Sequence, residues 1–283
     1  MYLTVNGARL FFDTVGAQLR IDGARMAERP ALVVLHGGPG FDHSLMRRYF
    51  DRFADTHQVV YLDHRGNGRS GGEADTWRLG QWGDDIKDFC DALGLIKPSV
   101  LGLSFGGMAA MAYATRHPEH PGKLVLASTA ARMDLPATYA AMERLGGERA
   151  AAIARRFWTD PDPEAAGEYL TVCLPLYNPK PSLDPLGVQR AIMRTEVMFH
   201  FIVGEQRTMN MLGDLARIAC PTLVTAGGAD PITPPACSEA IFAALPAGLG
   251  EIEIFAAAGH GVHRDEPERA EASLRRFLLK EIA

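Results

Sequence analysis

We expect an α/β fold in this chain, with a mostly parallel central sheet, helices on both faces and an inserted helical lid. Two observations predict the sheet and the helices that cover it. Short apolar runs of strand length recur along the chain, at 31–35, 58–62, 99–103, 123–127, 221–226 and 251–255. Helical patterns separate most of them, at 83–93, 105–117 and 238–245. Apolar strands that alternate with helices are typical of a parallel sheet buried on both sides.

A third observation predicts the lid, because the alternation stops between roughly 131 and 214. That stretch is helix-rich and punctuated by prolines, and strand–helix order resumes at 219. The length of 283 residues alone would suggest two domains, at roughly 150 residues per domain. We predict instead one core domain, residues 1–131 and 214–283, and a helical cap at 132–213 that shapes a substrate pocket.

The N-terminal elements follow from turn signals. Asn6-Gly7 lies between the short runs 3–5 and 9–14, which predicts a hairpin. Residues 21–29 read as a polar turn region. The uncharged stretch 98–115 approaches the length of a membrane span, but a glycine-rich turn interrupts it. We therefore expect a strand, a tight turn and a helix there, and no membrane partner.

Composition and charge exclude several classes of protein. The 29 Lys and Arg residues against 34 Asp and Glu give a net charge of −5, so we expect no nucleic-acid partner. The four cysteines form no Cys-x-x-Cys pair, which favours buried thiols over disulfides or a zinc module. The N-terminus lacks the basic and apolar regions of a signal peptide, which makes the cytoplasm the expected location.

Residues 102–106, Gly-Leu-Ser-Phe-Gly, match the G-x-S-x-G nucleophile elbow in the required strand-to-helix context. Glycines at 102 and 106 permit a turn so tight that Ser104 is strained and its hydroxyl is exposed above the sheet. The pattern predicts that Ser104 is a nucleophile; the alternative is a plain glycine-rich turn.

A serine nucleophile needs a base and an orienting acid, which follow the serine in the order acid, then histidine. Asp230 and His260 each come after a predicted strand, where the carboxyl ends of parallel strands would bring them toward Ser104. Taken singly, Asp230 could be a turn or N-cap residue before Pro231, and His260 an exposed loop histidine.

The loop His36-Gly-Gly-Pro-Gly40 follows a predicted central strand. Glycines there let backbone amides approach an oxyanion, and we predict that the amides of Gly38 and Phe105 stabilise it. The alternative is a loop that binds nothing. His260-Gly-Val-His263 resembles H-x-x-H, but no further ligands lie nearby, so no metal site is expected.

Three segments together resemble the α/β-hydrolase fold family, and within it the proline iminopeptidase-like branch: His36-Gly-Gly-Pro-Gly40, Asp63-His-Arg-Gly-Asn-Gly-Arg-Ser70 and Gly102-Leu-Ser-Phe-Gly-Gly107. The resemblance covers both core segments. In that branch, cap glutamates bind the amine of an N-terminal proline. The resemblance implies this role for Glu196, in a segment similar to the family's, with Glu205 as a second candidate. The alternative for Glu196 is a solvated helix carboxylate.

These features predict a serine hydrolase that uses no cofactor and cleaves a small ester or amide through an acyl-enzyme. The resemblance favours a proline iminopeptidase that acts on a small molecule or short peptide. A carboxylesterase or lactonase of the same fold is the main alternative. A ligand receptor that has lost turnover, or a lyase using the same three residues, is a further alternative.

Overall fold

The computed structural model describes residues 1–280. Its centre is an eight-stranded sheet in the order β1-β2-β6-β5-β7-β8-β9-β10. The strands are β1 (Tyr2–Val5), β2 (Ala8–Val15), β5 (Ala31–Leu35), β6 (Gln58–Leu62), β7 (Ser99–Leu103), β8 (Lys123–Ala127), β9 (Thr222–Gly227) and β10 (Gly250–Phe255). The pairs from β6 to β10 are parallel, whereas β1 and β2 pair antiparallel. All six predicted apolar runs are strands of this sheet, which confirms the mostly parallel fold.

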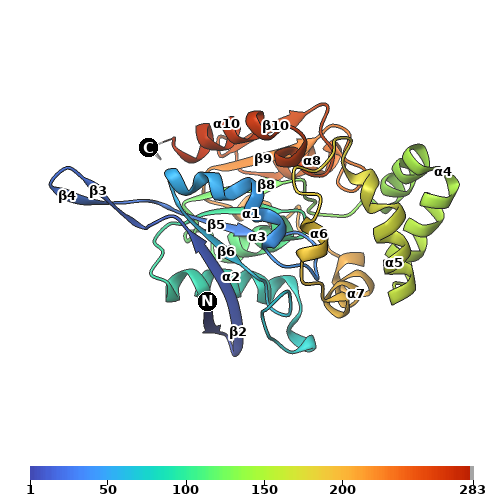
Figure 1. Cartoon of the computed structure of the whole chain (residues 1–283), viewed down its shortest axis with the longest axis horizontal. Coiled ribbons are helices and arrows are strands. Elements are labelled where there is room, and N and C mark those ends of the chain that lie inside the picture. Colours follow the sequence, from blue (N-terminus) through green and yellow to red (C-terminus); the bar gives the residue numbers. More distant parts are fainter. Residues whose placement is uncertain (281–283) are drawn as a thin grey trace.

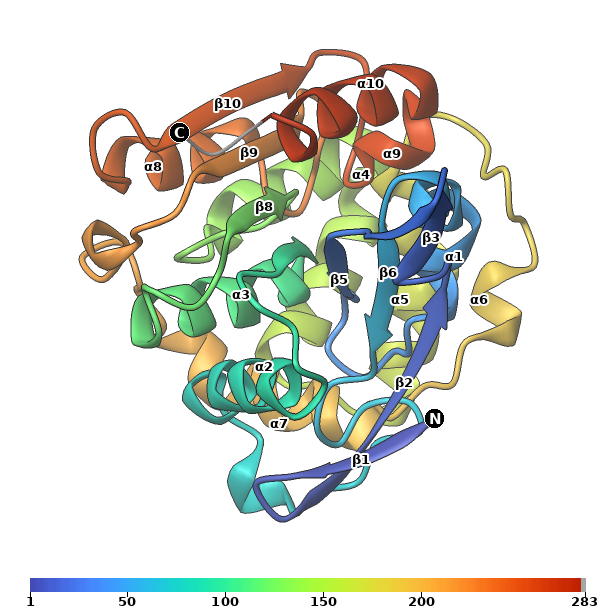
Figure 2. The same cartoon turned by 90° about the vertical axis from the view of Figure 1, so that its left-hand side faces the viewer.

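The helices cover both faces of the sheet (Figures 1 and 2). They are α1 (Ser44–Phe50), α2 (Leu79–Ala92), α3 (Phe105–Arg116), α4 (Leu135–Thr159), α5 (Pro163–Val172), α6 (Gly187–Arg190), α7 (Thr195–Val203), α8 (Pro235–Ala244), α9 (Val262–Asp265) and α10 (Pro267–Leu278). Strand residues alternate between two cores, so that Val33 and Leu35 face α2, α3 and α8, whereas Leu32 and Val34 face α1 and α10. This two-sided burial explains why the strands are apolar without interruption.

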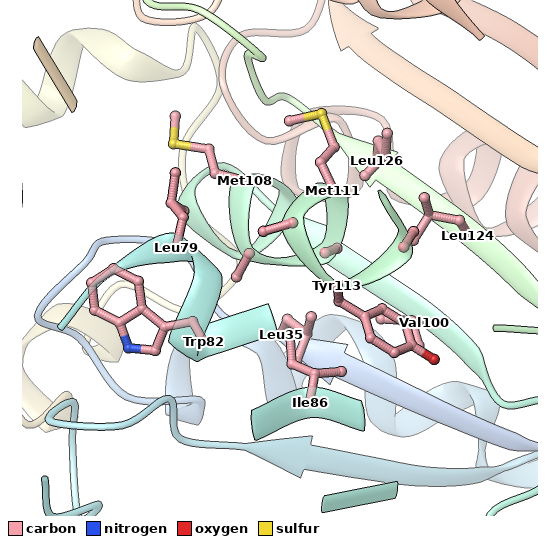
Figure 3. Close-up of a cluster of buried hydrophobic side chains, with 14 of the residues drawn as sticks. Leu35, Leu79, Trp82, Ile86, Val100, Met108, Met111, Tyr113, Leu124 and Leu126 are labelled. Atoms are coloured by element: carbon pink, nitrogen blue, oxygen red, sulfur yellow. The ribbon is translucent and has the colours of Figure 1, made fainter. Parts of the chain in front are cut away.

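The larger core lies between α2, α3 and the central strands (Figure 3). Its fully buried side chains include Leu35, Trp82, Ile86, Val100, Met111, Tyr113, Leu124 and Leu126. Gly83 lets the two helices pack closely, because a Cβ there would lie 2.8 Å from the backbone nitrogen of Tyr113. The rigid packing of α3 fixes the turn that precedes it, between β7 and α3.

The N-terminal prediction was right for one hairpin and wrong for another segment. Asn6 and Gly7 both have positive φ, 47° and 76°, and join β1 to β2 as expected. Residues 21–29 are not simply a polar turn: β3 (Leu19–Asp22) and β4 (Arg25–Glu28) pair as a separate two-stranded sheet. Their side chains are mostly exposed, so the burial pattern that marks a strand is absent.

Helices α4 to α7 lie between β8 and β9, and we call residues 132–213 the cap segment. Asp134 and Asp162 accept hydrogen bonds from the amides of Ala137 and Ala165 and so cap α4 and α5. Figure 1 shows α4 and α5 side by side at one end of the molecule, with the β3–β4 hairpin projecting at the other. No helix in residues 1–280 is both long and apolar enough to cross a membrane.

Candidate active site

Ser104 lies at the turn between β7 and α3, with φ 54° and ψ −118°. A Cβ at position 102 would collide with the carbonyl of Gly106, and one at 106 with the carbonyl of Leu35. Only glycine fits at both positions, so the sequence forces the tight turn. Ser104 N donates to Ala127 O at 2.9 Å, which ties the strained residue to the neighbouring strand β8.

The three residues predicted to act together lie in hydrogen-bond contact. The Ser104 Oγ is 3.0 Å from His260 Nε2. His260 Nδ1 is 2.9 Å from Asp230 Oδ2 and 3.1 Å from Asp230 Oδ1. An imidazole that donates from Nδ1 to a carboxylate presents a basic Nε2 to the serine hydroxyl, which is the arrangement needed to accept its proton.

The Asp230 carboxylate is fully buried and strongly held. Its Oδ1 accepts from the amides of Ile232 and Thr233 at 2.8 and 2.9 Å, and its Oδ2 accepts from Thr233 Oγ1 at 2.9 Å. Asp230 therefore bonds both to the amides of its own loop, as a turn residue does, and to His260, as the acid of a triad would. The two alternatives considered for this residue do not exclude each other. The buried carboxylate thus has four hydrogen-bond donors around its two oxygens.

The two residues predicted to stabilise an oxyanion are chain neighbours of Ser104 and of Gly37. Gly37 lies directly beside the serine, since a Cβ on Gly37 would be 3.4 Å from the Ser104 Cβ. Gly38 has φ 126°, a conformation that favours glycine, and Phe105 is the first residue of α3. Within the described residues, neither amide donates to a protein acceptor. Both are free to bind an external oxygen.

Hydrogen bonds of buried histidines stabilise the glycine loop at residues 36–40. His64 N donates to His36 Nε2 at 3.2 Å, so His36 carries its proton on Nδ1, which donates to Gly37 O at 2.7 Å. Burial lowers the pKa of both imidazoles, which keeps them neutral. Asn67 Oδ1 also accepts from Gly40 N at 2.6 Å. The 63–70 segment thus acts as a support for the glycine loop.

A cavity of about 480 Å³ opens above Ser104. Its walls are mainly apolar and aromatic, and the cap segment contributes Phe157, Trp158, Tyr169, Leu170, Leu174, Tyr177, Met198 and Ile202. His263 also lines the cavity. Burial, together with unfavourable electrostatic interactions with His260 and Arg264, lowers the pKa of His263 to about 3, so this imidazole is neutral near neutral pH.

The two cap glutamates lie away from Ser104. Glu196 is exposed in the first turn of α7 and is not part of the cavity wall. The Glu205 Oε2 accepts from Leu79 N at 2.6 Å, so Glu205 stabilises the N-terminus of α2 instead. Neither carboxylate is part of the cavity wall above Ser104.

Two contacts near His260 escaped the sequence prediction. The carbonyl of Tyr177, in a 3₁₀ turn of the cap segment, accepts from His260 N at 2.8 Å. Asp265 Oδ2 accepts from Gly259 N at 2.7 Å and from Asn178 Nδ2 at 2.9 Å. These bonds join the cap segment to the His260 loop. A short turn and a lone aspartate in a charged helix carry no sequence signal for such a role.

The four cysteines are free and buried, as predicted from their spacing. No cluster of three or more His, Cys, Asp or Glu side chains within residues 1–280 is arranged to hold a metal ion.

Comparison with known proteins places the chain in a family. The family model described as "Serine aminopeptidase, S33" matches residues 27–267. The putative carbamate hydrolase RutD of Caulobacter sp. (strain K31) is 29% identical over 279 residues, covering 95% of this chain and 97% of the relative. A proline iminopeptidase of Lactobacillus helveticus is 31% identical over 240 residues, covering 76% and 79% of the two chains.

A solved structure agrees with this relationship. The proline iminopeptidase of Mycobacterium smegmatis superposes with a TM-score of 0.77 and 23% identity, over 99% of this chain and 97% of that one. At this identity the likeness concerns the fold alone. Because the family model spans most of the sequence, the chain belongs to the S33 serine aminopeptidase family and has the α/β-hydrolase fold.

Proposed function

We propose that the protein is a serine hydrolase that cleaves small, neutral esters or amides through an acyl-enzyme. One observation carries the proposal: the unbroken chain of contacts from Ser104 through His260 to Asp230, 3.0 and 2.9 Å long, at the floor of an apolar cavity. The strained backbone of Ser104 supports it, since such strain persists where a side chain must be held in one place.

Each residue has a role in the proposed reaction. Ser104 Oγ attacks the scissile carbonyl while His260 Nε2 takes its proton, and Asp230 stabilises the imidazolium that forms. The amides of Gly38 and Phe105 donate to the oxyanion of the tetrahedral intermediate. His260 then protonates the leaving group, and a water activated by the same imidazole releases the acyl group. These steps need only side chains, backbone amides and water.

The charge of the cavity favours a neutral substrate. Two carboxylates of its wall outside the His260–Asp230 pair, Asp42 and Asp184, form ion pairs with Arg69 and Arg190. A free amine would therefore meet no unpaired carboxylate among the described wall residues. An ester, lactone or carbamate needs no such partner, and the full-length likeness to a putative carbamate hydrolase fits this class.

A proline iminopeptidase is the second candidate, since a relative of that name is 31% identical. It requires a carboxylate for the substrate's amine. Glu196 is exposed and Glu205 caps α2, so the cap would have to rearrange to provide one. The amine-binding role of these two residues stays a prediction.

A comparison of substrates with and without an amine tests both candidates. We expect the protein to hydrolyse para-nitrophenyl butyrate and to label with a fluorophosphonate, and to cleave proline para-nitroanilide no faster than butyric acid para-nitroanilide, which lacks the amine. Ser104→Ala should abolish hydrolysis and labelling, with an unchanged melting temperature as the control for folding.

Three other outcomes would contradict the proposed function or the proposed nucleophile. Faster cleavage of the proline substrate, lost in Glu196→Gln, would establish the iminopeptidase. Labelling that persists in Ser104→Ala would remove Ser104 as the nucleophile. Tight binding of esters without turnover would support a receptor instead.

A further inference from the structure

Three aromatic side chains of the cap segment form a hydrogen-bond chain in the cavity wall. Trp158 Nε1 donates to the Tyr169 hydroxyl at 3.1 Å, and the hydroxyls of Tyr169 and Tyr177 are 2.7 Å apart. All three residues line the cavity above Ser104. Phe157 stacks on Tyr169 with ring centroids 4.1 Å apart, and the Trp158 ring meets Tyr169 edge-on. The packing holds the chain in one geometry.

This network of Trp158, Tyr169 and Tyr177 has one more donor proton than it has hydrogen bonds. The indole donates one hydrogen bond and each phenol donates one, so the three groups supply three protons. Two hydrogen bonds join them, and each uses one proton. Whichever phenol donates to the other, one O–H is left, and among the described residues no other acceptor lies within hydrogen-bond distance of either phenol oxygen.

On Tyr169, a residue that is 3% exposed, the remaining O–H would be out of reach of bulk water; on Tyr177, which is half-buried, it would lie in the cavity wall. Burial raises the pKa of both phenols, so that each keeps its proton at neutral pH. Buried donors normally have a partner. The group faces a cavity that a substrate would fill, and a substrate acceptor is the partner that the site can offer.

Tyr177, one of the two phenols that can hold the free O–H, lies beside the proposed catalytic groups. The Tyr177 ring meets His260 edge-on, with centroids 5.2 Å apart, and the Tyr177 carbonyl accepts from His260 N. The neighbouring wall is apolar, with Phe157, Met198 and Ile202 close to the same aromatic cluster. An oxygen acceptor on the substrate would gain a bond here, whereas a methylene group would leave the phenol unpaired.

We propose that Trp158, Tyr169 and Tyr177 act as a specificity device that presents one phenol O–H to the substrate. It selects esters or amides with a second, neutral oxygen, such as an ether, ketone or hydroxyl, a few atoms from the scissile carbonyl. The inference rests on the proposed hydrolase function and narrows its substrate class.

Isosteric ester pairs test this inference. On the acyl side, para-nitrophenyl pentanoate is compared with para-nitrophenyl methoxypropanoate, in which an ether oxygen replaces one methylene. On the alcohol side, butyl acetate is compared with methoxyethyl acetate. The readout is the ratio of kcat/KM within each pair, divided by the ratio of alkaline hydrolysis rates, so that a general change in activity or reactivity cancels.

We expect the wild-type protein to prefer the ether ester by about three- to tenfold in at least one pair, the effect of one neutral hydrogen bond. Each single phenylalanine variant leaves one phenol O–H, so the preference should fall below about twofold in the double variant Tyr169→Phe/Tyr177→Phe, which leaves none. Tyr49→Phe is the matched control, because Tyr49 lines the cavity but its hydroxyl faces Ser182 Oγ, 3.4 Å away. That variant should keep the preference.

Two results would overturn the inference while leaving the hydrolase intact: no ether preference in either pair, or a preference that survives in the double variant. A second double variant, Tyr169→Leu/Tyr177→Phe, keeps the test available if the first one fails to fold. Absence of Ser104-dependent hydrolysis with all four esters would instead refute the proposed hydrolase function.

Discussion

The backbone around Ser104 is constrained by the elements packed against it. Ser104 holds a positive φ of 54°, at a cost of roughly 1–3 kcal/mol that the surrounding core must offset. The glycines at 102 and 106 are required for the same reason, since any side chain would meet backbone of another element. The turn therefore depends on the absence of side chains at 102 and 106 as much as on the serine itself.

Asp230→Asn tests the proposed orienting role at this scale. The amide oxygen can still accept from the Ile232 and Thr233 amides, so the loop should keep its shape. An amide NH₂ would face His260 Nδ1, however, and favour the wrong tautomer. We expect kcat for para-nitrophenyl butyrate to fall roughly 10⁴-fold with little change in melting temperature.

A matched control for that substitution is Asp184→Asn, which changes a cavity carboxylate that is ion-paired to Arg190 and has no contact with His260. Its kcat should stay within about tenfold of the wild-type value. Equal losses in both variants would mean that the effect of Asp230→Asn is not specific to the imidazole.

The candidate site was predictable where residues follow strands. Ser104, Asp230 and His260 each come after an apolar run, and parallel strands bring their carboxyl ends to one edge. Glu196 and Glu205 could not be placed in this way, because a cap helix has no register with the sheet. Tyr177 and Asp265 were missed because one contributes its main-chain carbonyl and the other a contact made only in the folded chain.

At the scale of elements, the cap segment is tied to the His260 loop through one buried carboxylate. Asp265 is 2% exposed, and both of its side-chain hydrogen bonds, from Gly259 N and Asn178 Nδ2, are made by Oδ2. Its Oδ1 has no partner among the described residues. One oxygen atom thus holds both the loop of the proposed base and the turn that contains Tyr177.

Because only Oδ2 of Asp265 is hydrogen-bonded, two substitutions of this residue should differ in their effect on stability and activity. Asp265→Ala removes both bonds, and we expect a loss of about 3 kcal/mol in the free energy of unfolding together with a lower kcat. Asp265→Asn keeps one acceptor oxygen and should retain most of the stability and activity. Urea unfolding and kcat with para-nitrophenyl butyrate measure the two effects. Equal behaviour of the two variants would contradict this reading of the contacts.

Elements were predicted well where burial shaped their sequence. Every central strand is apolar because it is covered on two faces, whereas β3 and β4 pair only with each other and expose most of their side chains. Exposed strands need no apolar pattern, and their alternation was hidden among charged residues. The physical cause of the error is thus the lack of a core beneath that hairpin.

For the molecule as a whole, buried histidines should make stability depend on pH. His57 is 1% exposed, and burial together with the charges of Lys123 and Arg275 lowers its pKa to about 4. The pKa of His263 is lowered to about 3. Each is neutral in the folded state but binds a proton in the unfolded chain below pH 6.5, so stability is lost as the pH falls from about 6.5 toward 4.

We expect each of these two histidines to cost about 1 kcal/mol of stability between pH 7 and pH 5.5. Melting temperatures or urea midpoints measured at both pH values would reveal the loss. His57→Asn, which retains a polar atom near Thr56 Oγ1, should reduce the loss by about the 1 kcal/mol that His57 contributes. A stability that does not change across this range would show that the buried imidazoles are already compensated.

The projecting β3–β4 hairpin has a practical consequence. Its strands pair only with each other, and it extends from the end of the molecule opposite α4 and α5 (Figure 1). A dye, an affinity handle or a surface tether attached at its Gly23 turn would stand clear of the cavity and of both main cores. Immobilised through that arm, the protein would present α4 and α5 of the cap segment outward, in a uniform orientation.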